Sequence, residues 1–116
     1  MQSAMNKCKE ITAKALMTDP TQLEKEQQFA TLAKALAHPA RVRILKILFT
    51  LDNLGGCLNS DLVSELGLAQ STVSEHLRIL KQAGFISAEP MPPKMCYRIN
   101  RQTAETFSTL FSQLLD

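Results

Sequence analysis

The residues best suited to chemistry lie between positions 70 and 81, where small hydroxyl and amide side chains are followed by charged ones. Hydroxyl and amide groups hydrogen-bond to the edges of nucleic-acid bases, and a carboxylate accepts a hydrogen bond from a cytosine amino group. Basic side chains one helical turn further on neutralise phosphates. Together these residue types predict a surface that reads DNA. The candidate contact residues are Gln70, Ser71, Thr72, Ser74, Glu75, His76, Arg78 and Lys81.

The spacing of apolar residues around this stretch predicts two short helices joined by a glycine turn. The first covers residues 60–66, where Asn59 or Ser60 can cap the first turn. Gly67 ends it, because glycine adopts the left-handed conformation without a Cβ clash. The pair predicts a helix-turn-helix unit, although an ordinary hairpin of two helices with a solvated polar face has the same spacing. The second helix covers residues 70–83 and has one apolar face, formed by Val73, Leu77 and Leu80.

A β-hairpin is predicted directly after this unit. Residues 85–89 and 95–99 have the composition of short strands, and the loop 90–94 between them contains three prolines. Prolines are excluded from a central strand but suit the tip of a hairpin. A helix-turn-helix followed by a hairpin is a winged helix, whose wing offers Lys94 and Arg98 as further phosphate contacts. Because few charges lie near the wing tip, we expect the wing to make few such contacts.

A central, heavily buried helix is predicted before the helix-turn-helix unit. His38-Pro39 marks its start, since proline suits the first helical turn, where its missing N–H costs nothing. The apolar face that follows is broad, which indicates burial on more than one side. Its main residues are Val42, Ile44, Leu45, Ile47, Leu48 and Phe49.

Helices at the two ends of the chain complete the predicted architecture, which is mainly α with one β-hairpin. Asp19-Pro20 interrupts an amphipathic stretch, so residues 1–20 are expected to form a helical or flexible N-terminal segment. Residues 21–116 are expected to form one winged helix-turn-helix domain with terminal dimerisation helices. Their apolar side chains predict a helical dimer interface, although packing within the chain is the alternative. The candidate interface residues are Phe29, Phe107, Leu110, Phe111 and Leu114.

The composition limits the class of protein. With 116 residues, of which 45% are hydrophobic and 21% charged, the chain has the size and composition of one soluble domain. A net charge of +2 permits nucleic-acid binding without requiring it. No apolar run is long enough to span a membrane and the N-terminus lacks a signal core, so a cytoplasmic location is expected. Paired carboxylates, a nucleophile with its base and a phosphate-binding glycine loop are missing, which argues against an enzyme.

Three segments resemble the ArsR/SmtB family of metal- and metalloid-responsive repressors. Residues 36–45, Leu-Ala-His-Pro-Ala-Arg-Val-Arg-Ile-Leu, are similar to the opening motif of that family. Residues 70–77 resemble its recognition-helix motif, and residues 83–86 its entry to the wing. The resemblance extends over residues 22–116 and implies a homodimer whose first and last helices form the interface. It also implies a repressor that binds double-stranded operator DNA without a cofactor and is released by an inducer.

The sites at which members of this family bind inducers can be checked residue by residue. The zinc site on the last helix requires histidines, which residues 102–116 lack. The thiolate site uses a Cys-x-Cys pair, of which only Cys57 is present because Asn59 stands at the second position. A three-thiolate site for arsenite or another soft metal ion therefore has to gather Cys57, Cys96 and Cys8. Neither His38 nor His76 is expected to bind metal.

Alternatives stay open for the cysteines and for the function. Three scattered cysteines do not form a disulfide framework, and free thiols are the expectation for a reducing cytoplasm. Cys57 or Cys96 can instead be a small apolar residue facing the core. Two of the thiols can also oxidise to a disulfide, which would make the protein a redox-sensing repressor. The remaining alternative is a winged-helix protein-interaction module that does not bind DNA.

Overall fold

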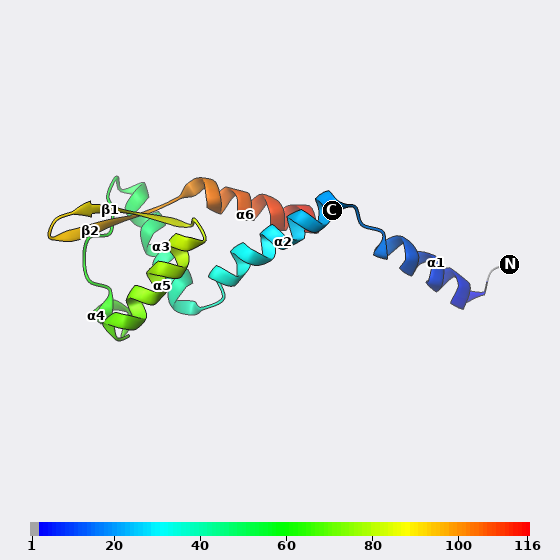
Figure 1. Ribbon diagram of the computed structural model, residues 1–116, viewed down its shortest axis with the longest axis horizontal. Coiled ribbons are helices and arrows are strands. Elements are labelled where there is room, and N and C mark those ends of the chain that lie inside the picture. The colour runs from blue at the N-terminus through cyan, green and yellow to red at the C-terminus, as the bar shows by residue number, and fades with distance from the viewer. Residues whose placement is uncertain (1–2) are drawn as a thin grey trace.

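The computed structural model describes residues 3–116, which form six helices and one antiparallel two-stranded sheet. Figure 1 shows a winged core at one end, a pair of helices leading away from it, and a separate N-terminal helix at the other end. The predicted architecture, mainly α with one β-hairpin, is confirmed. In chain order the elements are α1 (Ala4–Leu16), α2 (Pro20–Ala35), α3 (Pro39–Asn53), α4 (Val63–Leu66), α5 (Gln70–Gln82), β1 (Ile86–Met91), β2 (Lys94–Ile99) and α6 (Arg101–Leu114).

Helix α3 is the central helix, as the breadth of its apolar face predicts. It begins at Pro39, and the Nδ1 atom of His38 caps it by accepting a hydrogen bond from a backbone N–H of the first turn. Ile44 and Leu48 are almost fully enclosed. Val42, expected on the buried side, is instead 52% exposed. It lies two positions before Ile44, so the 3.6-residue period of the helix turns it away from the core.

The helix-turn-helix unit consists of α4, a glycine turn and α5. Helix α4 is shorter than predicted, because it begins at Val63 and not at Ser60. Leu62 is at the cap position, so neither Asn59 nor Ser60 caps α4. The carboxylate of Asp61 accepts from the Val63 backbone N–H at 2.8 Å. Gly67 ends α4 with a φ of 65°, in the left-handed region that favours glycine.

Strands β1 and β2 form the wing, paired in register from Ile86 opposite Ile99 to Met91 opposite Lys94. The strands are longer than predicted and leave only Pro92 and Pro93 as the turn. Tyr97 directs its backbone N–H and oxygen to Leu58, on the side of β2 away from β1. Bonded and non-bonded pairs alternate along an antiparallel ladder, so Pro90, paired with Met95, faces the free edge of β1 and removes no hydrogen bond from the sheet. The connector between α3 and α4 lies beside the wing and forms an isolated antiparallel bridge with β2.

Helices α2 and α6 pack against each other through aromatic side chains. The rings of Phe29 and Phe107 are stacked with their centroids 5.0 Å apart, and Phe107 meets Phe85 of the core edge-on at 6.1 Å. Leu110 of α6 is buried. Helix α1, in contrast, buries none of its side chains and projects away from the rest of the described chain (Figure 1).

Candidate nucleic-acid interface

Helix α5 divides cleanly into a buried and an exposed side. Val73 and Leu80 on its inner side are 2% and 0% exposed, and they hold the helix against the core. The outer side is polar from its first turn to its last. Seven of the eight residues proposed on this helix for DNA contact are exposed: Gln70, Ser71, Thr72, Ser74, Glu75, Arg78 and Lys81.

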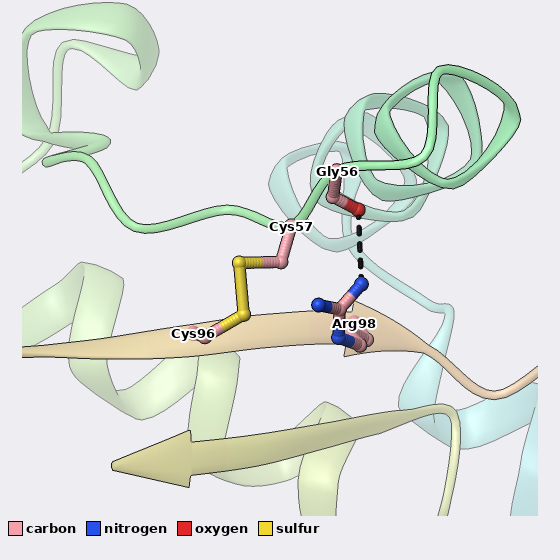
Figure 2. The surroundings of a disulfide bond; sticks show 4 residues. All are labelled: Gly56, Cys57, Cys96 and Arg98. Carbon is pink, nitrogen blue, oxygen red and sulfur yellow. Dashed lines mark hydrogen bonds between the residues drawn. A yellow bond between two sulfur atoms is a disulfide. The ribbon is translucent and has the colours of Figure 1, made fainter. Parts of the chain in front are cut away.

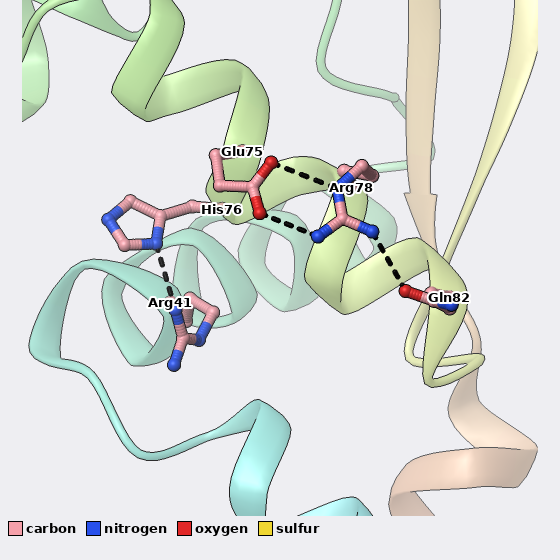
Figure 3. Close-up of polar contacts among 5 residues, drawn as sticks. All are labelled: Arg41, Glu75, His76, Arg78 and Gln82. Carbon is pink, nitrogen blue, oxygen red and sulfur yellow. Dashed lines mark hydrogen bonds and ion pairs between the residues drawn. The ribbon is translucent and has the colours of Figure 1, made fainter.

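His76 is the exception among these residues. Its side chain is only 6% exposed and points to the inner side of α5, as Figure 3 shows. A direct contact between His76 and DNA is therefore excluded in this conformation. The reason is its place on the helix, three residues after Val73 and four before Leu80, which puts it on the buried face.

An ion pair joins the two charged residues in the middle of the exposed side (Figure 3). The Arg78 guanidinium donates to both carboxylate oxygens of Glu75, at 2.9 and 2.6 Å, and to Oε1 of Gln82 at 2.9 Å. The hydrogen bond from Arg78 holds the pKa of Glu75 below its ordinary value, and the same contact raises the pKa of Arg78. Arg78 therefore lies along the helix, and it has to leave Glu75 before it can extend to a phosphate.

The start of α5 and the wing face a shared groove of about 280 Å³. Gln70 and Ser74 line it from the helix, and Lys94 and Tyr97 line it from β2. Gln70 also donates to the hydroxyl of Ser74, at 3.4 Å. The structure thus brings candidate residues of the recognition helix and of the wing to the same hollow.

Arg98 has a different place from the one expected for a wing contact. It is half-buried, and its Nη1 atom donates to the backbone oxygen of Gly56 at 3.3 Å (Figure 2). Arg98 therefore ties strand β2 to the connector that leads into α4. Lys94, at the turn of the hairpin, remains as the exposed basic side chain of the wing.

The three cysteines do not gather in one site. Cys57 and Cys96 form a disulfide whose Cα atoms are 5.7 Å apart (Figure 2), and Cys8 is exposed on α1. The expectation of three free thiols is wrong, because the fold places the connector directly against β2. Among residues 3–116, no three His, Cys, Asp or Glu side chains are grouped so that they could hold a metal ion. The structure therefore does not fit a three-thiolate centre within one chain.

Comparison with known proteins identifies the family. The sequence profile described as "Bacterial regulatory protein, arsR family" matches residues 38–88, which include α3, the helix-turn-helix unit and the start of the wing. The HTH-type transcriptional regulator YgaV of Escherichia coli is 32% identical over 87 residues, covering 74% of this chain and 85% of that protein. This chain belongs to the ArsR family. Its relatives are transcriptional regulators and not enzymes, as the sequence predicts.

Two further matches place this ArsR-family chain among its relatives. The HTH-type regulator Rv0081 of Mycobacterium tuberculosis is 41% identical over 70 residues, which are 60% of this chain and 59% of that protein. Its crystal structure has a TM-score of 0.56 at 32% identity, covering 78% of this chain and 88% of that chain. Reduced HlyU from Vibrio cholerae has a TM-score of 0.60 at 27% identity, covering 75% and 85%.

No helix within residues 3–116 of this ArsR-family chain has both the length and the apolar character needed to cross a membrane.

Two features of the winged helix were not anticipated from the sequence. Asp61 accepts a hydrogen bond from the first backbone N–H of α4, and Arg41 of α3 reaches His76 of α5. Asp61 precedes a predicted apolar stretch and is a good capping residue, so its role had a local signal. The contact of Arg41 with His76 spans 35 positions, and no local pattern indicates it.

Proposed function

We propose that the chain is a homodimeric cytoplasmic repressor that binds double-stranded operator DNA through α5 and the wing. The observation that carries this proposal is the exposed polar side of α5, on which seven hydrogen-bonding or charged residues are displayed while the opposite side is buried. A helix of this kind lies in the major groove with its N-terminal residues at the base edges. The wing, through Lys94, adds a phosphate contact at one side of the groove.

A second copy of the chain is needed to bind two half-sites. Of the five residues proposed for the dimer interface, Phe29, Phe107 and Leu110 already pack within their own chain. Phe111 and Leu114 stay 51% and 43% exposed on α6, so they are the side chains available to a partner. A two-fold dimer would set its two recognition helices about 34 Å apart, on successive major grooves of a near-palindromic site.

The test of DNA binding is a titration of DNA from upstream of the gene, at several salt concentrations, with three variants. Wild-type protein is expected to bind with an affinity that falls as salt rises. Arg78→Ala should weaken binding and reduce the salt slope by about 1.8, since each of the two protomers loses one phosphate contact worth about 0.9. Glu75→Gln should strengthen binding at low salt, because it frees Arg78 and removes a negative charge from the DNA-facing side.

The double variant Glu75→Gln/Arg78→Ala is the control for this comparison. Arg78→Ala loses the Arg78 contact and also leaves the Glu75 carboxylate unpaired. The double variant loses the contact without leaving that charge, so it separates the two causes of weaker binding. Equal salt slopes for all four proteins would remove Arg78 from the contact surface. Absence of binding by the wild type at low salt would contradict the proposed function itself.

We further propose that the inducer acts on the Cys57–Cys96 pair by thiol oxidation. Disulfides in cytosolic proteins are typically redox-sensing or catalytic. Cys57 is half-buried and Cys96 is fully enclosed, so an oxidant reaches the pair through Cys57. The two thiols lose two electrons and two protons on forming the disulfide. Hydrogen peroxide takes them up and becomes two water molecules, and an alkyl hydroperoxide becomes an alcohol and one water. The bond joins the connector before α4 to strand β2, so it constrains the wing relative to the helix-turn-helix unit.

The expected result is that peroxide lowers operator affinity by about 5- to 150-fold, the usual range for coupling between two sites. A phosphine reductant should restore it. Cys57→Ser and Cys96→Ser should bind DNA with an affinity that neither reagent changes, whereas Cys8→Ser should respond like the wild type. Equal affinities of the oxidised and reduced wild type would contradict redox control. Release of the reduced protein by arsenite, but not of Cys57→Ser, would instead support a thiol-bound metalloid as the inducer.

A further inference from the structure

The buried side of α5 carries one polar side chain, His76, which meets α3. The Arg41 guanidinium lies 3.0 Å from Nδ1 of His76 (Figure 3). A guanidinium only donates hydrogen bonds, so Nδ1 has to accept. His76 is therefore neutral in this arrangement, with its proton on Nε2. That Nε2 atom is buried and has no hydrogen-bond partner among the described residues.

Arg41 connects three helices through its two contacts. It belongs to the first turn of α3, and its Nε atom donates to the backbone oxygen of Ala35 at 2.7 Å. Ala35 is the last residue of α2, where the final backbone oxygens have no partner within the helix. With its other contact on His76, Arg41 joins the end of α2 and the start of α3 to the middle of α5.

The groups around His76 oppose a positive charge on its ring. Burial is the largest cause that lowers its pKa below the ordinary value, and the nearby His38 and Arg41 act in the same direction. The His38 ring, from the turn before α3, lies with its centroid 4.3 Å from that of His76. Glu75 is the neighbouring group that favours the charged form, but its carboxylate is engaged by Arg78.

A metal ion shared by His38 and His76 is a poor alternative. Nδ1 of His38 accepts from the Ala40 backbone N–H, and Nδ1 of His76 faces the Arg41 cation. A metal ion at this place would lie close to a permanent positive charge, with at most two imidazole nitrogens as protein ligands. The arrangement suits a hydrogen bond between helices and not a metal centre.

We propose that the hydrogen bond between Arg41 and neutral His76 positions α5 for DNA binding, and that protonation of His76 breaks it. The proposal rests on the DNA-binding function above and identifies His76 and Arg41 as positioning residues, since neither belongs to the exposed contact side. In imidazolium both ring nitrogens donate, so Nδ1 can no longer accept from Arg41. The two cations then repel each other, and α5 loses its polar link to α2 and α3.

The pH dependence follows from the lowered pKa of His76. Below its ordinary value of about 6.5, the unfolded chain binds a proton that the folded chain resists. The contribution of the contact to stability is therefore complete above about pH 6.5 and is lost as the pH falls through the lower pKa of the folded state. Operator affinity is expected to follow the same course.

The experiment compares operator affinity from pH 7.5 to pH 5 for the wild type and three variants. In His76→Asn the side-chain oxygen takes the place of Nδ1 and accepts from Arg41 without titrating. This variant should keep binding within about threefold of the wild type at pH 7.5 and lose the acid-dependent decline. At every pH, His76→Ala should bind at least about tenfold more weakly than the wild type does at pH 7.5, since a hydrogen bond to a charged group is lost. His38→Gln is the matched control. It should keep an acid-dependent decline but shift it to higher pH, because a group that lowers the pKa of His76 is removed.

Nitrogen NMR of the His76 ring tests the contact independently of DNA. The expected spectrum shows a neutral ring protonated at Nε2 and a pKa below the ordinary range, and Arg41→Met should raise that pKa by removing a neighbouring cation. A ring protonated at Nδ1, or a His76→Asn variant with the acid decline of the wild type, would overturn the proposal. If the wild type binds no DNA at any pH while the NMR result stands, the proposed function fails and the contact between the helices remains.

Discussion

Replacing Phe111 with glutamate is expected to convert the proposed dimer to a monomer and to weaken operator binding by at least about 100-fold. Phe111 lies on α6 with half of its surface exposed, and its ring centroid is 5.8 Å from that of Phe29 on α2. A glutamate there would place a charge at the centre of the proposed dimer interface. A monomer engages one half-site only, and linking two binding units commonly increases affinity by 10²–10⁴. Light scattering after size-exclusion chromatography and fluorescence anisotropy with operator DNA measure the two effects.

Gln113→Glu provides the matched control for this substitution. It adds the same charge on the same helix, but the side chain at position 113 points away from the side of Phe111. Leu114→Glu should repeat the effect of Phe111→Glu, because Leu114 is the other exposed apolar residue among those proposed for the interface. A Phe111→Glu protein that is still dimeric and binds DNA normally would show that another surface, such as the apolar side of α1, joins the two copies.

The winged helix itself was predictable from local patterns. Gly67 has to adopt a left-handed conformation, so the end of α4 was evident from the residue type alone. The hairpin was marked by apolar residues on either side of a proline-rich segment. The errors lie at the boundaries: the strands extend further into that segment than expected, and α4 begins only at Val63, whose backbone N–H bonds to Asp61.

The candidate site was predictable on the surface of α5 and less so in its interior. The positions of Val73 and Leu80 fix which side of α5 is buried, and the exposed polar residues follow from them. The same spacing places His76 on the inner side, so its burial could be predicted. Its polar character instead led to the prediction of an exposed DNA contact. No sequence pattern indicates the partner of His76, since Arg41 lies on another helix.

The cysteine pair shows the same limit on sequence analysis. Cys57 and Cys96 are 39 residues apart, and one lies in an irregular connector while the other lies in a strand. Their pairing depends on where the connector runs, which Leu58 and Tyr97 help to fix through two backbone hydrogen bonds of 2.9 and 2.8 Å. Neither bond has a signature in the residue types. The sequence therefore left the disulfide as one alternative among several.

Leu80→Ala is expected to lower the free energy of unfolding by about 2–5 kcal/mol, the usual range for a buried leucine truncated to alanine. Leu80 is fully enclosed on the inner side of α5, where it packs within the same core as Ile44 and Phe85. The substitution removes no group from the side of α5 proposed to face DNA. Its effect on DNA binding should therefore appear only where the protein begins to unfold. Urea denaturation followed by circular dichroism gives the change in stability, and operator titrations at 10 °C and 37 °C give the change in binding.

Lys81→Ala is the complementary variant, because Lys81 follows Leu80 directly and lies on the exposed side. Its stability should stay within about 0.5 kcal/mol of the wild type, as is usual for surface substitutions. Its operator affinity should fall equally at both temperatures, since the loss of a phosphate contact does not depend on unfolding. If Leu80→Ala were as stable as the wild type, α5 would not be held by the core. If Lys81→Ala bound DNA normally, the contact surface would end before the last turn of α5.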